Sequence, residues 1–142
     1  MAFNVLIVDD SAAMRAVIKK TIKVSGFKVG EYLEAPNGQE ALEILGNAWV
    51  DLVLSDINMP NMNGLELIAE MKKDRDLKAI PVVMVTTEGS EKSMQRSMEL
   101  GAKGYIKKPF QPEDIRKVLN EIMGEPEDGN NEYDDSDENF DF

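Results

Sequence analysis

Residues 4–26 have the sequence NVLIVDDSAAMRAVIKKTIKVSG, in which a short apolar run is followed at once by two aspartates and then by an amphipathic segment. A continuous apolar run of this length is typical of a strand buried on both faces of a parallel sheet. The apolar residues of the second part recur at the spacing of one helix face: Met14, Val17, Ile18 and Ile22. Ser11 and Gly26 suit the two ends of that helix. The stretch therefore predicts a strand, an acidic turn and a helix.

The same alternation continues along the chain. Predicted strands cover residues 29–35, 52–55, 81–85 and 104–107. Predicted helices cover residues 38–45, 65–73, 90–100 and 112–123, the first of them stopped by Gly46. Met94 and Met98 are expected to be packing residues of the helix at 90–100. Five strands alternating with five helices favour a doubly wound α/β fold with an open, mainly parallel sheet.

Composition excludes several kinds of chemistry and location. The 142 residues include no cysteine and no histidine, which excludes disulfides, thiolate sites and histidine-ligated metals. No apolar run reaches membrane-spanning length, and the first one is too short for a secretory signal, so we expect a cytoplasmic protein without membrane association.

Charge divides the chain into two parts. Residues 124–142 hold nine acids and no base, whereas residues 1–123 hold 18 acids and 16 bases. We therefore expect one domain over residues 1–123 and a flexible acidic tail over residues 124–142. Such a charge distribution does not favour nucleic-acid binding.

Reactive side chains follow four of the predicted strands. They are Asp9 and Asp10 at the end of the first strand, Asp56 at the end of the third, Thr86 and Thr87 at the end of the fourth, and Lys108 after the fifth. Because the carboxyl ends of parallel strands meet at one edge of the sheet, we expect these side chains to converge. Carboxylates bind Mg²⁺, and an aspartate can accept a phosphoryl group whose oxygens are stabilised by a hydroxyl and an ammonium.

Four segments resemble a known family: VLIVDDSAAMR, LVLSDINMPNMNGLEL, PVVMVTTE and GAKGYIKKPF. They are similar to the receiver domains of two-component response regulators, and among these to the single-domain chemotaxis regulators of the CheY type. The resemblance covers residues 3–123. It implies a flavodoxin-like (β/α)5 sheet with strand order 2-1-3-4-5, which is the order known for this type. It also implies a cis peptide bond between Lys108 and Pro109.

The resemblance also implies how the acidic residues act. Asp56 is expected to be the phosphoacceptor. Asp9, Asp10 and Asp56 are expected to hold Mg²⁺, with Mn²⁺ as a substitute, together with the backbone carbonyl of Asn58.

Other positions are expected, by the same resemblance, to sense or protect the phosphoryl group. Thr86 and Lys108 are expected to bind it, and Tyr105 to be the aromatic side chain that moves on activation. Three residues are expected to modulate access to the phosphoryl group and its lifetime: Thr87, Asn58 and Glu88. Thr87 favours slower attack by water, whereas the pairing of Asn58 with Glu88 favours a short lifetime, so the net direction stays open.

These expectations lead to a signalling protein rather than an enzyme acting on a separate substrate. A sensor histidine kinase would phosphorylate Asp56. A monomeric product would then bind a target, such as a flagellar motor switch component, through residues 90–123, and a phosphatase would reset it. One alternative is a relay intermediate that passes the phosphoryl group to a histidine phosphotransfer protein. Another is a Mg²⁺-dependent phosphatase of the haloacid dehalogenase type. The acidic tail is expected to be a solubilising appendage. Two alternatives are that it covers the target surface or that it docks to a partner itself.

Overall fold

The computed structural model describes residues 2–87 and 90–124, so Glu88 and the predicted tail from residue 125 onward lie outside the described residues. It contains five strands: β1 (Phe3–Val8), β2 (Val29–Ala35), β3 (Leu52–Ser55), β4 (Val82–Thr86) and β5 (Gly104–Lys107). It contains five helices: α1 (Ala12–Ser25), α2 (Gly38–Asn47), α3 (Gly64–Lys73), α4 (Glu91–Glu99) and α5 (Pro112–Met123). The strands are parallel and lie in the order β2-β1-β3-β4-β5, which confirms the predicted sheet.

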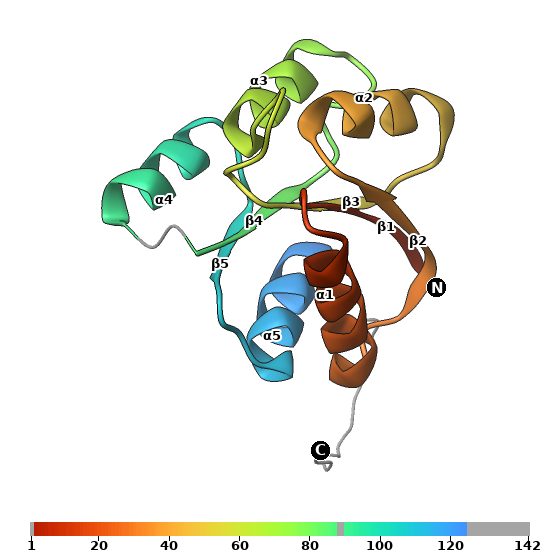
Figure 1. Cartoon of the computed structure of the whole chain (residues 1–142). Helices are drawn as coiled ribbons and strands as arrows, with labels where there is room; N and C mark the ends of the chain where they lie inside the picture. The colour runs from red at the N-terminus through yellow and green to blue at the C-terminus, as the bar shows by residue number, and fades with distance from the viewer. Residues whose placement is uncertain (1, 88–89, 125–142) are drawn as a thin grey trace.

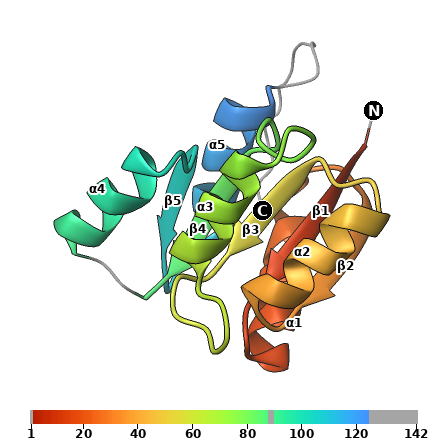
Figure 2. The ribbon, with the colours of Figure 1, turned by 90° about the horizontal axis from the view of Figure 1, so that it is seen from above.

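The sheet is sandwiched between helices. Helices α1 and α5 cover one face and α2 and α3 the other, as Figure 1 shows. Seen from above in Figure 2, α4 stands beyond β5, away from the α2–α3 pair. Successive residues of β1 face opposite layers: Val5 and Ile7 pack with α1 and α5, whereas Leu6 and Val8 pack with α2 and α3. This burial on both faces explains why the central strands are continuous apolar runs.

The predicted ends of α1 are confirmed. The Ser11 hydroxyl accepts a hydrogen bond from the Met14 N–H at 3.1 Å, and Gly26 follows the helix with a φ of 86°. The left-handed backbone conformation at this position favours glycine, because glycine has no Cβ to clash with the backbone.

Three sequence-based details are wrong. Helix α2 runs through Gly46 to Asn47, because the chain turns extended only at Ala48, whose N–H donates to the Ile44 carbonyl at 2.9 Å. Val17 is 49% exposed, since it lies at the margin of the α1 face whose centre is Ile18 and Ile22. Met94 and Met98 are likewise exposed, because Ser97 is the buried residue of α4.

Two further observations concern the backbone. The Lys108–Pro109 peptide bond is cis, as the resemblance implies. Within residues 2–87 and 90–124, the helices are all too short or too polar to cross a membrane.

Candidate functional site

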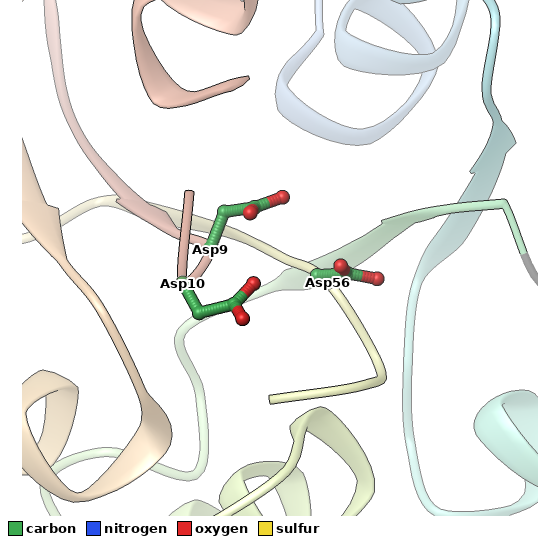
Figure 3. Close-up of side chains that lie close together, drawn as sticks. All are labelled: Asp9, Asp10 and Asp56. Carbon is green, nitrogen blue, oxygen red and sulfur yellow. The ribbon is translucent and has the colours of Figure 1, made fainter. Parts of the chain in front are cut away.

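Three aspartates meet at the carboxyl edge of the sheet. Asp9 directly follows β1 and Asp56 directly follows β3, and these strands are neighbours in which Val8 pairs with Ser55. Carboxylate oxygens of Asp9, Asp10 and Asp56 lie within 4.8 Å of one another, and Figure 3 shows the three side chains gathered where the two strands end. Asp9 is buried, Asp56 is half-buried and Asp10 is exposed. The predicted convergence of the three acids is therefore confirmed, and the site is open to solvent on the Asp10 side.

Lys108 brings a positive charge to this cluster from the other side of β4. Its Nζ lies 2.9 Å from Oδ2 of Asp9 and 3.5 Å from Oδ2 of Asp56. The Lys108 N–H donates to the Thr86 carbonyl at 2.8 Å, which continues the β4–β5 pairing by one residue and directs the lysine toward the acids. At these separations the ammonium offsets a substantial part of the repulsion among the three carboxylates.

Backbone N–H groups fix the orientation of two of the carboxylates. Oδ1 of Asp9 accepts from the Ser11 N–H at 2.9 Å, and Oδ1 of Asp56 accepts from the Ile57 N–H at 2.7 Å. Each carboxylate therefore has one oxygen held by the main chain and the other, Oδ2, directed toward Lys108. Hydrogen bonds of this kind to an ionised group are among the stronger ones in proteins.

Gly64 shapes the loop that follows Asp56. Its N–H donates to the Ile57 carbonyl at 2.8 Å, so the loop folds back onto its own start. A Cβ at Gly64 would overlap the Asp56 carbonyl oxygen and lie 3.0 Å from the Ile57 Cα. The preceding Asn63 starts α3 with a capping box shared with Glu66. Glycine is therefore required here for close approach of two backbones, although sequence reasoning gave it no role beyond marking a loop.

Arg15 also contributes to the site, although no motif in the sequence indicates a role for it. Its Nη1 donates to the Asp9 carbonyl at 2.6 Å, and its Nε pairs with Glu34 of β2 at 2.9 Å. Lys19 pairs with the other Glu34 oxygen at 2.9 Å. Hydrogen bonding from Lys19 and then from Arg15 lowers the pKa of Glu34 below its usual value. The signal that was available is the placement of Arg15 one turn beyond Ser11 on the same helix.

The remaining predicted residues lie around the three acids. Thr86 is fully buried at the end of β4, and Thr87 next to it is exposed. Asn58 is exposed in the loop after Asp56. Tyr105 of β5 is partly buried and packs against the cluster that α2 and α3 form with the sheet. The roles assigned to these four residues, and to Glu88 outside the described residues, stay predictions.

Comparison with known proteins gives a consistent result. Residues 5–120 match the family model of the response regulator receiver domain. The chain is 40% identical to the chemotaxis protein CheY1 of Helicobacter pylori over 122 residues, which cover 85% of this chain and 97% of that protein. It is 38% identical to a chemotaxis protein CheY homolog of Campylobacter jejuni, covering 85% of this chain and 92% of the relative. Among solved structures, Vibrio cholerae chemotaxis protein CheY4 superposes with a TM-score of 0.76 at 34% identity, covering 86% of this chain and 99% of that one.

Proposed function

Because the chain belongs to the response regulator receiver domain family, we propose that it is a signalling switch whose Asp56 accepts a phosphoryl group from a phosphohistidine of a sensor histidine kinase. The observation that carries this proposal is the convergence of Asp9, Asp10 and Asp56, with Lys108 reaching two of them. A carboxylate that is half-buried and oriented, but still reachable by a donor, suits a transient acceptor.

The donor set fits a hard divalent cation. Three carboxylates with oxygens within 4.8 Å of one another are the ligands that Mg²⁺ or Mn²⁺ binds well. Asp9, Asp10 and Asp56 would hold the ion, and the backbone carbonyl of Asn58 would complete the protein ligands. When bound, the cation would neutralise negative charge on the carboxylates and on an incoming phosphoryl group.

The chain's own residues would then act on the phosphoryl group as follows. A carboxylate oxygen of Asp56 forms the new P–O bond, the P–N bond to the donor imidazole breaks, and the imidazole nitrogen keeps the electron pair and takes up a proton. The Ile57 N–H holds Oδ1 of Asp56 throughout, at 2.7 Å in this structure. Lys108 and the Thr86 hydroxyl stabilise the phosphoryl oxygens. Thr87, Asn58 and Glu88 control access of water and hence lifetime.

The output would be a change in protein binding. Phosphorylation shifts the population toward a state in which Tyr105 and the surface of α4, β5 and α5 are altered. Met94 and Met98 of α4 are 41% and 46% exposed, which provides apolar contact area for a target. Because relatives of this chain are named chemotaxis proteins, the proposed target is a flagellar motor switch component. A phosphatase is proposed as a second partner, and a monomer in the cytoplasm as the working form.

The acidic tail is proposed to interact with that same surface. Six basic residues in or next to α4, β5 and α5 are exposed: Lys92, Arg96, Lys103, Lys107, Arg116 and Lys117. The tail carries nine acids and no base, so its charge is complementary to these side chains. It would compete with a target at low ionic strength.

A relay intermediate would use the same acceptor chemistry as a signalling switch, so only assays with partner proteins distinguish these two functions. Transfer from the phosphorylated protein to a histidine phosphotransfer protein, without binding to a motor component, would favour the relay. The haloacid dehalogenase alternative needs its nucleophile after the first strand, and family membership does not support it.

Metal dependence tests the proposal. A small-molecule phosphodonor is expected to phosphorylate the protein with Mg²⁺ present and not with a chelator in excess. Asp9→Asn and Asp10→Asn should each slow the reaction by at least about tenfold, because each removes a ligand charge. Asp74→Asn, at the end of α3, is the matched control and should leave the rate unchanged. Equal rates with Mg²⁺ and with chelator would contradict the proposed site.

A further inference from the structure

Arg15 connects three elements at the edge of the acidic site. It lies in the first turns of α1, its Nη1 donates to the Asp9 carbonyl at 2.6 Å, and its Nε donates to Oε1 of Glu34, in β2, at 2.9 Å. The side chain is only 16% exposed. A guanidinium has a planar, fixed arrangement of donors, so two contacts made by one group define its position closely.

The contact to Asp9 completes the restraint of that residue. The Asp9 N–H donates to the Ala35 carbonyl at 3.0 Å, and its carboxylate contacts the Ser11 N–H and Lys108, each at 2.9 Å. The Asp9 carbonyl is the remaining polar group, and Arg15 is its donor. This carbonyl belongs to the peptide bond that leads into Asp10, so the guanidinium also sets the plane from which the exposed Asp10 side chain extends.

Glu34 anchors the guanidinium and balances its charge. Its two oxygens pair with Arg15 and with Lys19, both at 2.9 Å. Because the Glu34 carboxylate lies against the Arg15 guanidinium, it offsets part of the guanidinium charge that would otherwise repel a cation bound at the three acids. Lys19 pairs with Oε2 of Glu34, whereas Arg15 pairs with Oε1. A Lys19 variant therefore serves as a control for Arg15 variants.

From these contacts we infer that Arg15 is a positioning residue for the metal site, acting through the Asp9 carbonyl and anchored by Glu34. The inference rests on the proposed Mg²⁺ site and adds to it a residue that contacts neither the cation nor the phosphoryl group. Partners of metal ligands typically change metal affinity by about 10- to 100-fold. Arg15 contacts the Asp9 main-chain carbonyl rather than the carboxylate itself, so an effect at the lower end of this range, about tenfold, is expected.

The sign of the change in affinity separates positioning from charge. Arg15→Gln removes both the guanidinium geometry and its charge, whereas Arg15→Lys keeps the charge. If Arg15 positions Asp9 and Asp10, both variants bind Mg²⁺ more weakly in isothermal titration at fixed ionic strength, by about tenfold for Arg15→Gln. If Arg15 acts through charge alone, Arg15→Gln binds Mg²⁺ more tightly. Lys19→Gln, the matched control, is expected to bind Mg²⁺ as the unmodified protein does.

A second readout needs no metal. The Ser11 N–H donates to the Asp9 carboxylate at 2.9 Å, so amide hydrogen exchange at Ser11 reports how firmly that carboxylate is held. Exchange at Ser11 is expected to rise about tenfold in both Arg15 variants and to stay unchanged in Lys19→Gln.

The possible outcomes are distinct. A lower melting temperature with unchanged Mg²⁺ affinity and unchanged Ser11 exchange would show that Arg15 is merely structural, and would overturn the inference. If the unmodified protein binds no Mg²⁺, the proposed metal site fails, while Ser11 exchange still decides whether Arg15 positions Asp9. If Arg15→Gln does not fold, Arg15→Lys carries both measurements.

Discussion

Replacing Gly64 with alanine places a methyl group against the wall of the acidic site. The added Cβ would overlap the Asp56 carbonyl oxygen and lie 3.0 Å from both the Ile57 Cα and the Met84 Cε. Two of these three atoms belong to the backbone and cannot move away by changing a side-chain rotamer. Overpacking costs about 1–3 kcal/mol where side chains can adjust, so we expect about 3 kcal/mol of destabilisation here. The better helix propensity of alanine offsets less than about 1 kcal/mol of this.

Urea unfolding measures the effect. With a slope of about 1.5 kcal/mol per molar urea for a domain of this size, a loss of about 3 kcal/mol moves the midpoint down by about 2 M. Gly46→Ala is the matched control, because Gly46 lies in α2 and, among the described residues beyond its chain neighbours and the α2 backbone, no atom comes within 4 Å of the new Cβ. That variant is expected to be stabilised by up to about 1 kcal/mol. A Gly64→Ala midpoint at or above that of the unmodified protein would refute the argument that close backbone contact fixes the Asp56 loop.

Three more predictions concern charge. Lys108→Met removes the ammonium that competes with a cation for Asp9, so Mg²⁺ affinity in isothermal titration is expected to rise about tenfold, and equal or weaker binding would contradict this. The folded pKa of Glu34 lies below its ordinary value of 4.5, so its ion pairs stabilise the protein above about pH 4.5 and this contribution is lost as pH falls through the folded pKa. Because Glu34 is partly exposed, Glu34→Gln should destabilise the protein by only about 0.5 kcal/mol at pH 7, and this difference should vanish in acid. A difference in urea midpoint that does not change with pH would contradict a stabilising role for the ionised Glu34 side chain. Truncation after Met123 is expected to change amide NMR shifts around the basic residues of α4, β5 and α5 at low salt but not at high salt, and identical spectra would exclude masking by the tail.

The fold follows from short-range patterns because the central strands β1, β3 and β4 are buried on both faces over most of their length. The apolar runs at β1, β3 and β4 differ clearly from the amphipathic helices between them, and the order of polar residues after each strand predicts which edge carries the site. Val17 and Gly46 were misjudged for a different reason. The width of a buried helix face and the residue at which a helix ends depend on tertiary packing, which periodicity alone does not contain.

The sequence predicts the ionisable residues of the candidate site but not the residues that position them. Asp9, Asp10, Asp56 and Lys108 carry chemistry that can be recognised residue by residue. Arg15 acts through a backbone carbonyl, and Gly64 acts by lacking a side chain. Neither contribution has a sequence signature of its own. The contribution of Arg15 arises only when β1, β2 and α1 come together, and that of Gly64 only when the loop after Asp56 folds back.

Intact-mass spectrometry after incubation with Mg²⁺ and a small-molecule phosphodonor tests directly whether Asp56 is the phosphoacceptor. Asp51 provides the control, because it lies at the opposite end of β3 and binds the Asn4 N–H and the Trp49 indole. We expect one added phosphoryl group in the unmodified protein and in Asp51→Asn, and none in Asp56→Asn. A phosphoryl group that persists in Asp56→Asn would show that another residue is the acceptor.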